Sequence, residues 1–155
     1  MSNLTPVIKS IQDIMRQDSG VDGDAQRISQ LTWLLFLKVF DALEEELELT
    51  RDHYQSPIPE AMRWRNWATD AEGITGEALL DFVDNQLFAT LKSLSADPVR
   101  NPRGYVVRGV FEDADNYMKS GHLLRQVVNK LHELKVKGAL TDEEFATEKK
   151  KILDR

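Results

Sequence analysis

Apolar residues recur at helical spacing along most of the chain, and the first helix is expected over residues 5–18. Thr5 and Pro6 begin it as N-cap residue and first-turn proline. A Gly- and Asp-rich turn comes next, with Asp24 as the expected cap of a second helix. From residue 25 to about 51 neither Gly nor Pro interrupts the chain, and apolar residues lie almost all round the expected helix. Such a helix is typical of the buried centre of a bundle.

The middle of the chain alternates between loop and helix signals. Residues 56–76 hold two prolines and two glycines and predict a long ordered loop, whereas residues 77–94 return to helical spacing and predict a third long helix. The run from Tyr105 to Phe111 fits a strand by its β-branched residues or a short helix by its context. We favour a helix or a turn there.

Two further helices are expected near the C-terminus. The residues from Ser120 to His122 resemble a cap, and Gly138 ends the helix that follows. Thr141 and Glu144 match a capping box for a final helix that runs through Leu153. We therefore predict an all-α fold, in which residues 1–132 form a helical bundle around a buried central helix and residues 133–155 form a C-terminal helical hairpin.

Composition fits one intracellular globular domain with a short appendage. The 155 residues are 41% hydrophobic and 30% charged, a balance typical of a folded protein. The run from Leu31 to Phe40 is too short to span a membrane, and no signal peptide is visible, so we expect a cytoplasmic protein. There is no cysteine, and the three histidines stand apart, so neither a disulfide nor a structural metal site is expected.

The motifs of common enzymes are missing from this sequence. No Gly-x-Gly occurs, so neither a dinucleotide fingerprint nor a glycine-rich methyl-donor loop is encoded, and no P-loop is present. The acidic group of Glu112, Asp113 and Asp115 is better explained as a solvated turn than as a magnesium site. We predict no catalytic, cofactor-binding or metal-binding residue in this chain and no intrinsic enzymatic activity.

The basic residues are concentrated in one segment of an otherwise acidic chain. The formal net charge is -6, yet residues 92–130 carry seven basic and four acidic side chains. Five of the basic residues are candidates for phosphate contacts with nucleic acid: Arg100, Arg103, Arg108, Lys119 and Arg125. The alternative is that they pair with the acidic end of the central helix, residues 41–52, which we expect to emerge into solvent.

An aromatic and basic group stands in the predicted loop. Arg63, Trp64, Arg65 and Trp67 are candidates for binding a partner, because arginine and tryptophan are typical interface anchors. The alternative is that both tryptophans fix the loop to the core, and we favour it because tryptophan is usually well buried.

The stretch from Arg27 to Lys38 reads Arg-Ile-Ser-Gln-Leu-Thr-Trp-Leu-Leu-Phe-Leu-Lys. It resembles the signature of the N-terminal helical domain of the modification (M) subunits of type I restriction-modification systems. The similarity covers about residues 3–132 and continues through these positions: Arg63, Trp64, Trp67, Arg108 to Ala114, Asn116 to Gly121 and Leu124 to Lys130.

The resemblance implies a part in site-specific adenine-N6 methylation of DNA. In that family S-adenosylmethionine is the methyl donor, and the M subunits work with a specificity subunit and with a nuclease-translocase subunit. The catalytic domain that follows carries a methyl-donor loop and an Asn-Pro-Pro-Tyr/Phe motif for a flipped adenine. This sequence has neither of them, and its one Asn-Pro pair, Asn101-Pro102, continues with Arg103.

After Glu133 the sequence departs from the family. Residues 134–155 are similar to the short C-terminal (SHOCT) helical module, which implies a tail for interaction or homo-oligomerisation. Our leading hypothesis is a non-catalytic helical module that contacts specificity and M subunits and reaches DNA through their complex. The alternatives are a regulatory or decoy protein that competes for the M-subunit docking surface, and a truncated remnant that binds nothing.

Overall fold

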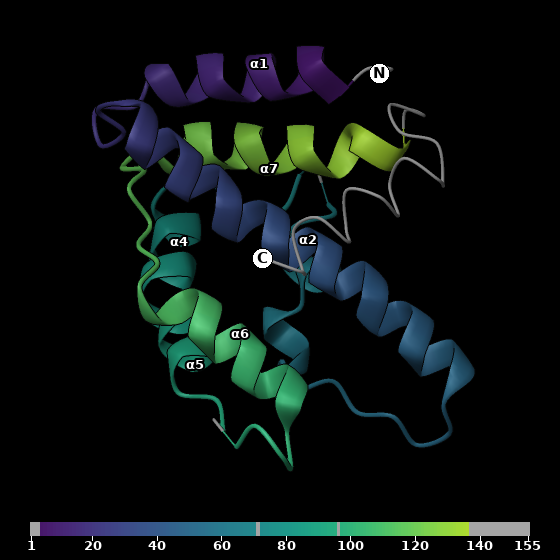
Figure 1. Cartoon of the computed structure of the whole chain (residues 1–155). Helices are drawn as coiled ribbons and strands as arrows, with labels where there is room; N and C mark the ends of the chain where they lie inside the picture. The colour runs from purple at the N-terminus through teal and green to yellow at the C-terminus, as the bar shows by residue number, and fades with distance from the viewer. Residues whose placement is uncertain (1–3, 71, 96, 137–155) are drawn as a thin grey trace.

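The computed structural model describes residues 4–70, 72–95 and 97–136, and these residues form helices and loops without a strand (Figure 1). Their elements, in chain order, are α1 (Leu4–Arg16), α2 (Asp24–Thr50), η1 (Glu60–Met62), α3 (Trp64–Trp67), α4 (Gly76–Asp81), η2 (Phe82–Leu87), α5 (Phe88–Lys92), α6 (Pro102–Glu112) and α7 (Gly121–Val136). The expected all-helical fold is therefore confirmed for the described part of the chain.

The three long helices predicted from hydrophobic spacing are present. The third is continuous from Gly76 to Lys92 but contains one turn of π-helix, η2, between α4 and α5. Residues 102–112, where a strand was the competing prediction, form helix α6. The Asn101 side chain caps it by accepting a hydrogen bond of 3.1 Å from the Gly104 N–H, and Pro102 stands in the first turn.

The expected long loop before α4 is more ordered than its composition indicates. It contains the 3-10 turn η1 and the single helical turn α3, and both of its tryptophans are buried. Of the two helix caps predicted here, the one before α7 is confirmed. The Ser120 hydroxyl accepts a hydrogen bond from the Leu123 N–H at 3.2 Å. For α2 the prediction was wrong, because Gly23 with φ 129° is the N-cap and Asp24 is the first helical residue.

Helices α1 and α7 lie side by side, and α2 runs obliquely past them before its C-terminal half extends away from both (Figure 1). Helices α4, α5 and α6 pack below (Figure 1), and the aromatic side chains of α5 and α6 meet those of α2. The rings of Trp33 and Phe88 are 4.8 Å apart between centroids, and those of Phe88 and Phe111 are 5.2 Å apart. Edge-to-face contacts of this kind join α2, α5 and α6 into one core.

The central helix is buried all round in its middle, as its composition predicted, because Phe36 to Asp41 are six consecutive buried residues. Trp33, Leu34 and Leu37 on its inner face are at most 1% exposed. The two ends of the helix are less enclosed: Ile28 near its start is 59% exposed and Leu49 near its end is 87% exposed. No helix of the described ranges is long and apolar enough to cross a membrane. The predicted C-terminal hairpin, with Thr141 and Glu144, lies outside the described residues.

Candidate interaction surfaces

Three of the five basic candidates are exposed but do not form one cluster. Arg100 follows α5 with a side chain 89% exposed, 3.9 Å from the Asp97 carboxylate. Arg108 lies on α6, where its guanidinium donates to the Leu94 carbonyl at 3.3 Å. Lys119 stands before α7, and its backbone N–H is held by the buried Asp18 carboxylate at 2.9 Å. Two different parts of the surface therefore carry the accessible cations.

Arg103 is occupied within the fold. Its Nε donates to the Glu44 carboxylate at 2.5 Å, and its guanidinium carbon lies 4.7 Å from the centroid of the Phe40 ring. Glu44 is 1% exposed and also accepts a hydrogen bond of 2.5 Å from the Tyr54 hydroxyl. Burial, together with this bond to Glu44, raises the pKa of Tyr54 to about 12. The ion-pair alternative is thus confirmed for Arg103.

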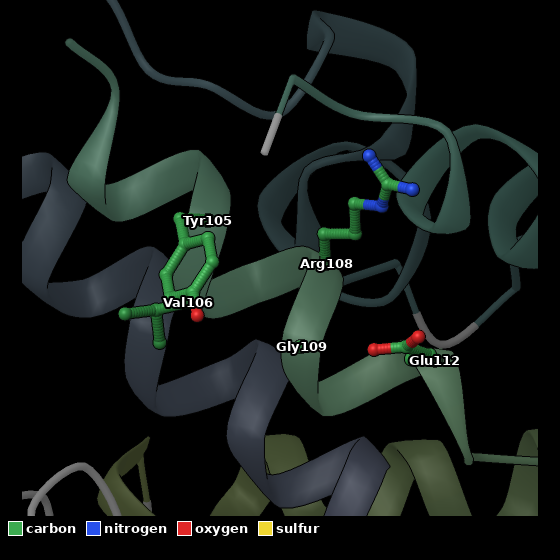
Figure 2. Close-up of a pocket in the computed structure, with 5 residues that line it drawn as sticks. All are labelled: Tyr105, Val106, Arg108, Gly109 and Glu112. Carbon is green, nitrogen blue, oxygen red and sulfur yellow. The ribbon is translucent and has the colours of Figure 1, made fainter. Parts of the chain in front are cut away.

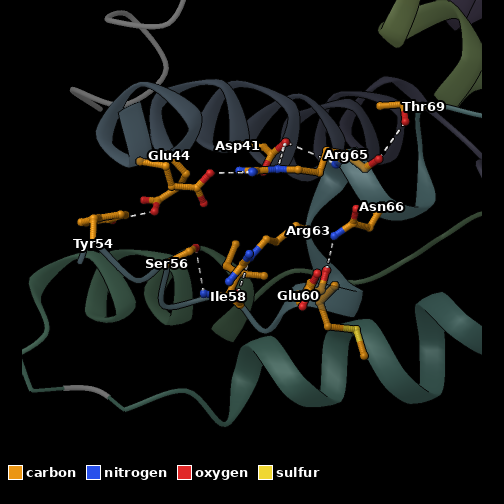
Figure 3. A network of polar contacts seen from close by, with 12 residues as sticks. Asp41, Glu44, Tyr54, Ser56, Ile58, Glu60, Arg63, Arg65, Asn66 and Thr69 are labelled. Carbon is orange, nitrogen blue, oxygen red and sulfur yellow. Dashed lines mark hydrogen bonds and ion pairs between the residues drawn. The ribbon is translucent and has the colours of Figure 1, made fainter. Parts of the chain in front are cut away.

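The acidic end of α2 is only partly in solvent, which corrects the sequence expectation. Asp41 is 5% exposed and accepts a bond of 3.0 Å from the Arg65 Nε (Figure 3). Glu48, two turns further along α2, accepts from the same guanidinium at 2.7 Å. Burial by itself lowers the pKa of Arg65. The hydrogen bonds to Asp41 and Glu48 together raise this pKa by more, so the net shift is upward. Arg65 therefore anchors α3 to the central helix.

The other aromatic-segment candidates also point inward. Trp64 and Trp67 are 3% and 6% exposed, with ring centroids 5.3 Å apart, and the Trp67 indole donates to the Met62 carbonyl at 3.0 Å. The Arg63 Nε donates to the Ile58 carbonyl at 2.9 Å (Figure 3). This burial supports the alternative that both tryptophans fix the loop to the core.

Arg125 is the clearest case of a cation used internally. It is 5% exposed on α7, and its guanidinium donates to the carbonyls of Trp67 and Ile74 at 2.9 Å each. Burial lowers the pKa of Arg125. These bonds hold the loop before α4 against α7, more than 50 residues away in the sequence. A phosphate group has no access to this side chain.

The outer side of α6 carries a surface that the sequence analysis did not single out. Tyr105 is 50% exposed and Val106 is 45% exposed. An open depression of about 310 Å³ lies there (Figure 2), lined by Tyr105, Val106, Arg108, Gly109 and Glu112. A helical projection of residues 102–112 would have found it, had the helix been certain.

A second depression lies beside the first, between α6 and the beginning of α2. Its volume is about 210 Å³, and it is lined by Ile28, Ser29, Thr32, Trp33, Val110, Asp113 and Ala114. Within the described ranges, no group of three His, Asp or Glu side chains is placed to hold a metal ion. Among the described residues, the surface around α6 therefore offers two shallow depressions together with dispersed charges.

Comparison with known proteins shows which families the chain resembles. The HsdM N-terminal domain family matches residues 4–131, and the SHOCT family, a short C-terminal domain, matches residues 128–153. The EcoEI methylase subunit of a type I restriction enzyme from Escherichia coli is 64% identical over 132 residues, which are 85% of this chain and 27% of that protein. The chain therefore spans about a quarter of the length of this relative.

Two solved structures share the fold. A modification subunit of a putative type I restriction enzyme from Vibrio vulnificus YJ016 aligns with a TM-score of 0.82 at 34% identity, over 98% of this chain and 34% of that one. A structure concerned with complex assembly and conformational transition of the type I restriction-modification system aligns with a TM-score of 0.77 at 29% identity, over 97% of this chain and 29% of that one. This chain belongs to the HsdM N-terminal domain family, found in the methylase subunits of type I restriction enzymes.

Proposed function

We propose that this chain is a non-catalytic helical module that docks with the specificity subunit and M subunits of a type I system and engages DNA through their complex. One observation carries the proposal: 64% identity over 132 residues to the EcoEI methylase subunit, in a chain that spans 27% of it. Identity of that extent must include many surface positions as well as the core, so we expect docking surfaces to be shared. We further propose that residues 1–132 form the docking domain and residues 133–155 a separate tail.

The internal contacts support a docking role because they make the helical domain a rigid unit. Arg65, Arg103 and Arg125 each join elements that are distant in the sequence. Partly buried, charge-assisted hydrogen bonds of this kind fix one arrangement of helices. A preorganised surface loses little conformational entropy when it binds, so more of the contact energy is available for affinity.

Of the five basic candidates, only those with accessible side chains can contact DNA. Arg100, Arg108 and Lys119 can reach a phosphate, whereas Arg103 and Arg125 are held inside. Three separated cations on an acidic chain predict weak binding by the chain alone at physiological salt. The proposed DNA contact therefore depends on the assembled complex.

A charge-reversal experiment tests this DNA contact. The Arg100→Glu and Lys119→Glu variants are assembled with the partner subunits, and DNA affinity is measured over a salt series. Each is expected to lower affinity and to reduce the slope of log K against log salt by about 1. Lys9→Glu, an exposed lysine on α1, is the matched control. Unchanged affinity and slope for both variants would remove the DNA contact from the proposal.

A regulatory or decoy role is the second candidate, and the SHOCT match over residues 128–153 favours it. A competition experiment separates the two roles: a fixed amount of full-length M subunit and specificity subunit is titrated with this chain. A decoy displaces the full-length M subunit and lowers methylation of DNA. An assembly module joins the complex without displacing it.

A further inference from the structure

The outer face of α6 combines exposed apolar groups with opposite charges. Tyr105 and Val106 stand in its first half, and Arg108 and Glu112 lie one turn apart along one side of Gly109 (Figure 2). Going beyond the docking role, we propose that this face is a self-association surface. On it, α6 of a second copy of this chain packs antiparallel, related by a two-fold axis near Val110.

Gly109 provides the room for such a close approach. Apart from its chain neighbours and the backbone of its own helix, a Cβ atom built on it would have no heavy atom within 4 Å, so the fold of the single chain does not require a glycine there. A glycine inside an exposed helix costs about 1 kcal/mol relative to alanine. Gly104, on the inner face of the same helix, differs because a Cβ there would lie 2.4 Å from the Asn101 side chain. A small residue on an outward face allows a second helix to approach closely.

The charged residues on this face, Arg108 and Glu112, can pair with the same two residues of a second copy. Arg108 and Glu112 are four residues apart, on the same flank of the helix and centred on Val110. In an antiparallel pair with a two-fold axis at that level, each Arg108 lies opposite Glu112 of the second copy, so two ion pairs form. Such an isologous contact uses the same patch on both chains. Arg108 alone could contact a phosphate, but the exposed Glu112 and Asp113 beside it make this face less favourable for nucleic acid than for a second copy of the chain.

The shape of the surface agrees with the same arrangement. Tyr105 and Val106 protrude from the first half of α6, whereas the depression of about 210 Å³ lies at its second half, beside Ile28 and Ala114. Antiparallel packing places the first half of one helix over the second half of the other. The apolar side chains of each copy then cover the depression of its partner, and exposed Ile28 of α2 enlarges the contact.

The expected association is weak. Helix α6 has 11 residues, which corresponds to a length of about 16 Å. A contact of that length, with a contribution from α2, lies below the area of stable dimers and is typical of a transient interface. We therefore expect a monomer-dimer equilibrium that is visible only at high protein concentration.

A charge-swap experiment tests the contact on the full chain. Sedimentation velocity is measured over a concentration series for the wild type, for Arg108→Glu, for Glu112→Arg and for an equal mixture of the two variants. Each variant alone places like charges opposite each other, so its dimerisation should weaken by about tenfold. The mixture restores both ion pairs, and it should dimerise at least as well as the wild type.

The controls make every outcome decisive. Both side chains are exposed, so helicity by circular dichroism should be unchanged, and Lys9→Glu serves as a charge change on another helix. A monomeric wild type at all concentrations would overturn the proposal. Dimerisation of equal strength in the wild type and in both charge-reversal variants would also overturn it. The contact would then lie elsewhere, such as in residues 133–155. Docking to the partner subunits is measured separately, so the proposed function can hold when this contact fails.

Discussion

The two faces of α6 contain similar residue types and behave in opposite ways. On the inner face, Arg103 binds Glu44, and Phe111 is fully buried among the rings of Trp33 and Phe88. On the outer face, Arg108 and Tyr105 stand in contact with solvent. Each face thus holds an arginine and an aromatic ring. The comparison teaches that position on the helix, rather than residue type, decides whether a side chain stabilises the fold or remains available to a partner.

The largest contrast is expected for the aromatic pair. Phe111→Ala removes a ring that is 0% exposed and leaves a cavity, so the free energy of unfolding should fall by about 4 kcal/mol. Tyr105→Ala on the outer face should change it by less than about 0.5 kcal/mol. Urea denaturation followed by circular dichroism measures both. Equal losses for the two variants would show that the outer face also belongs to the core.

A pH dependence is expected from the inner network, where Tyr54 donates to Glu44. The folded-state pKa of about 12 lies above the ordinary value of 10.0, so the folded chain holds this proton more tightly than the unfolded chain. The stabilisation is complete below pH 10 and is lost as the pH rises toward 12. Unfolding free energies measured across this range should fall less steeply for Tyr54→Phe. Identical slopes for the variant and the wild type would contradict the assigned hydrogen bond.

The smallest expected effect compares the two glycines of α6. Gly109→Ala should raise the free energy of unfolding by roughly 1 kcal/mol, because alanine is the better helix former and its Cβ meets nothing. Gly104→Ala should lower it by about 1 kcal/mol, because the new Cβ displaces the Asn101 cap. Thermal denaturation of both variants gives the signs. A loss of stability in Gly109→Ala would show that the glycine serves the single chain.

Hydrophobic spacing was enough to predict the three long helices, because their apolar faces repeat every three or four residues over many turns. At residues 105–111 the β-branched residues obscured the helix, although Asn101 and Pro102 form a clear N-terminal signal. The cap of α2 was misassigned because Asp24 is a common cap residue, whereas Gly23 takes that place here. Local signals were therefore reliable for the existence of long helices and less so for their ends.

The candidate sites were harder to predict because their surroundings come from distant parts of the chain. Arg125 is a basic residue by sequence, but its partners are the carbonyls of Trp67 and Ile74. Asp41 and Glu44 belong to an acidic run that indicated solvent, and only their contacts with Arg65 and Arg103 show otherwise. The recognisable family pattern, in contrast, depends on short sequence stretches and needed no tertiary information.

The central claim is that this chain acts by docking, and the mass of the species it forms with its partners tests it most directly. The purified chain is mixed with a specificity subunit and a full-length M subunit and measured by size-exclusion chromatography with light scattering. The account predicts a complex whose mass includes a whole number of 17.7 kDa chains. A helical, folded chain that elutes alone at every concentration would contradict it.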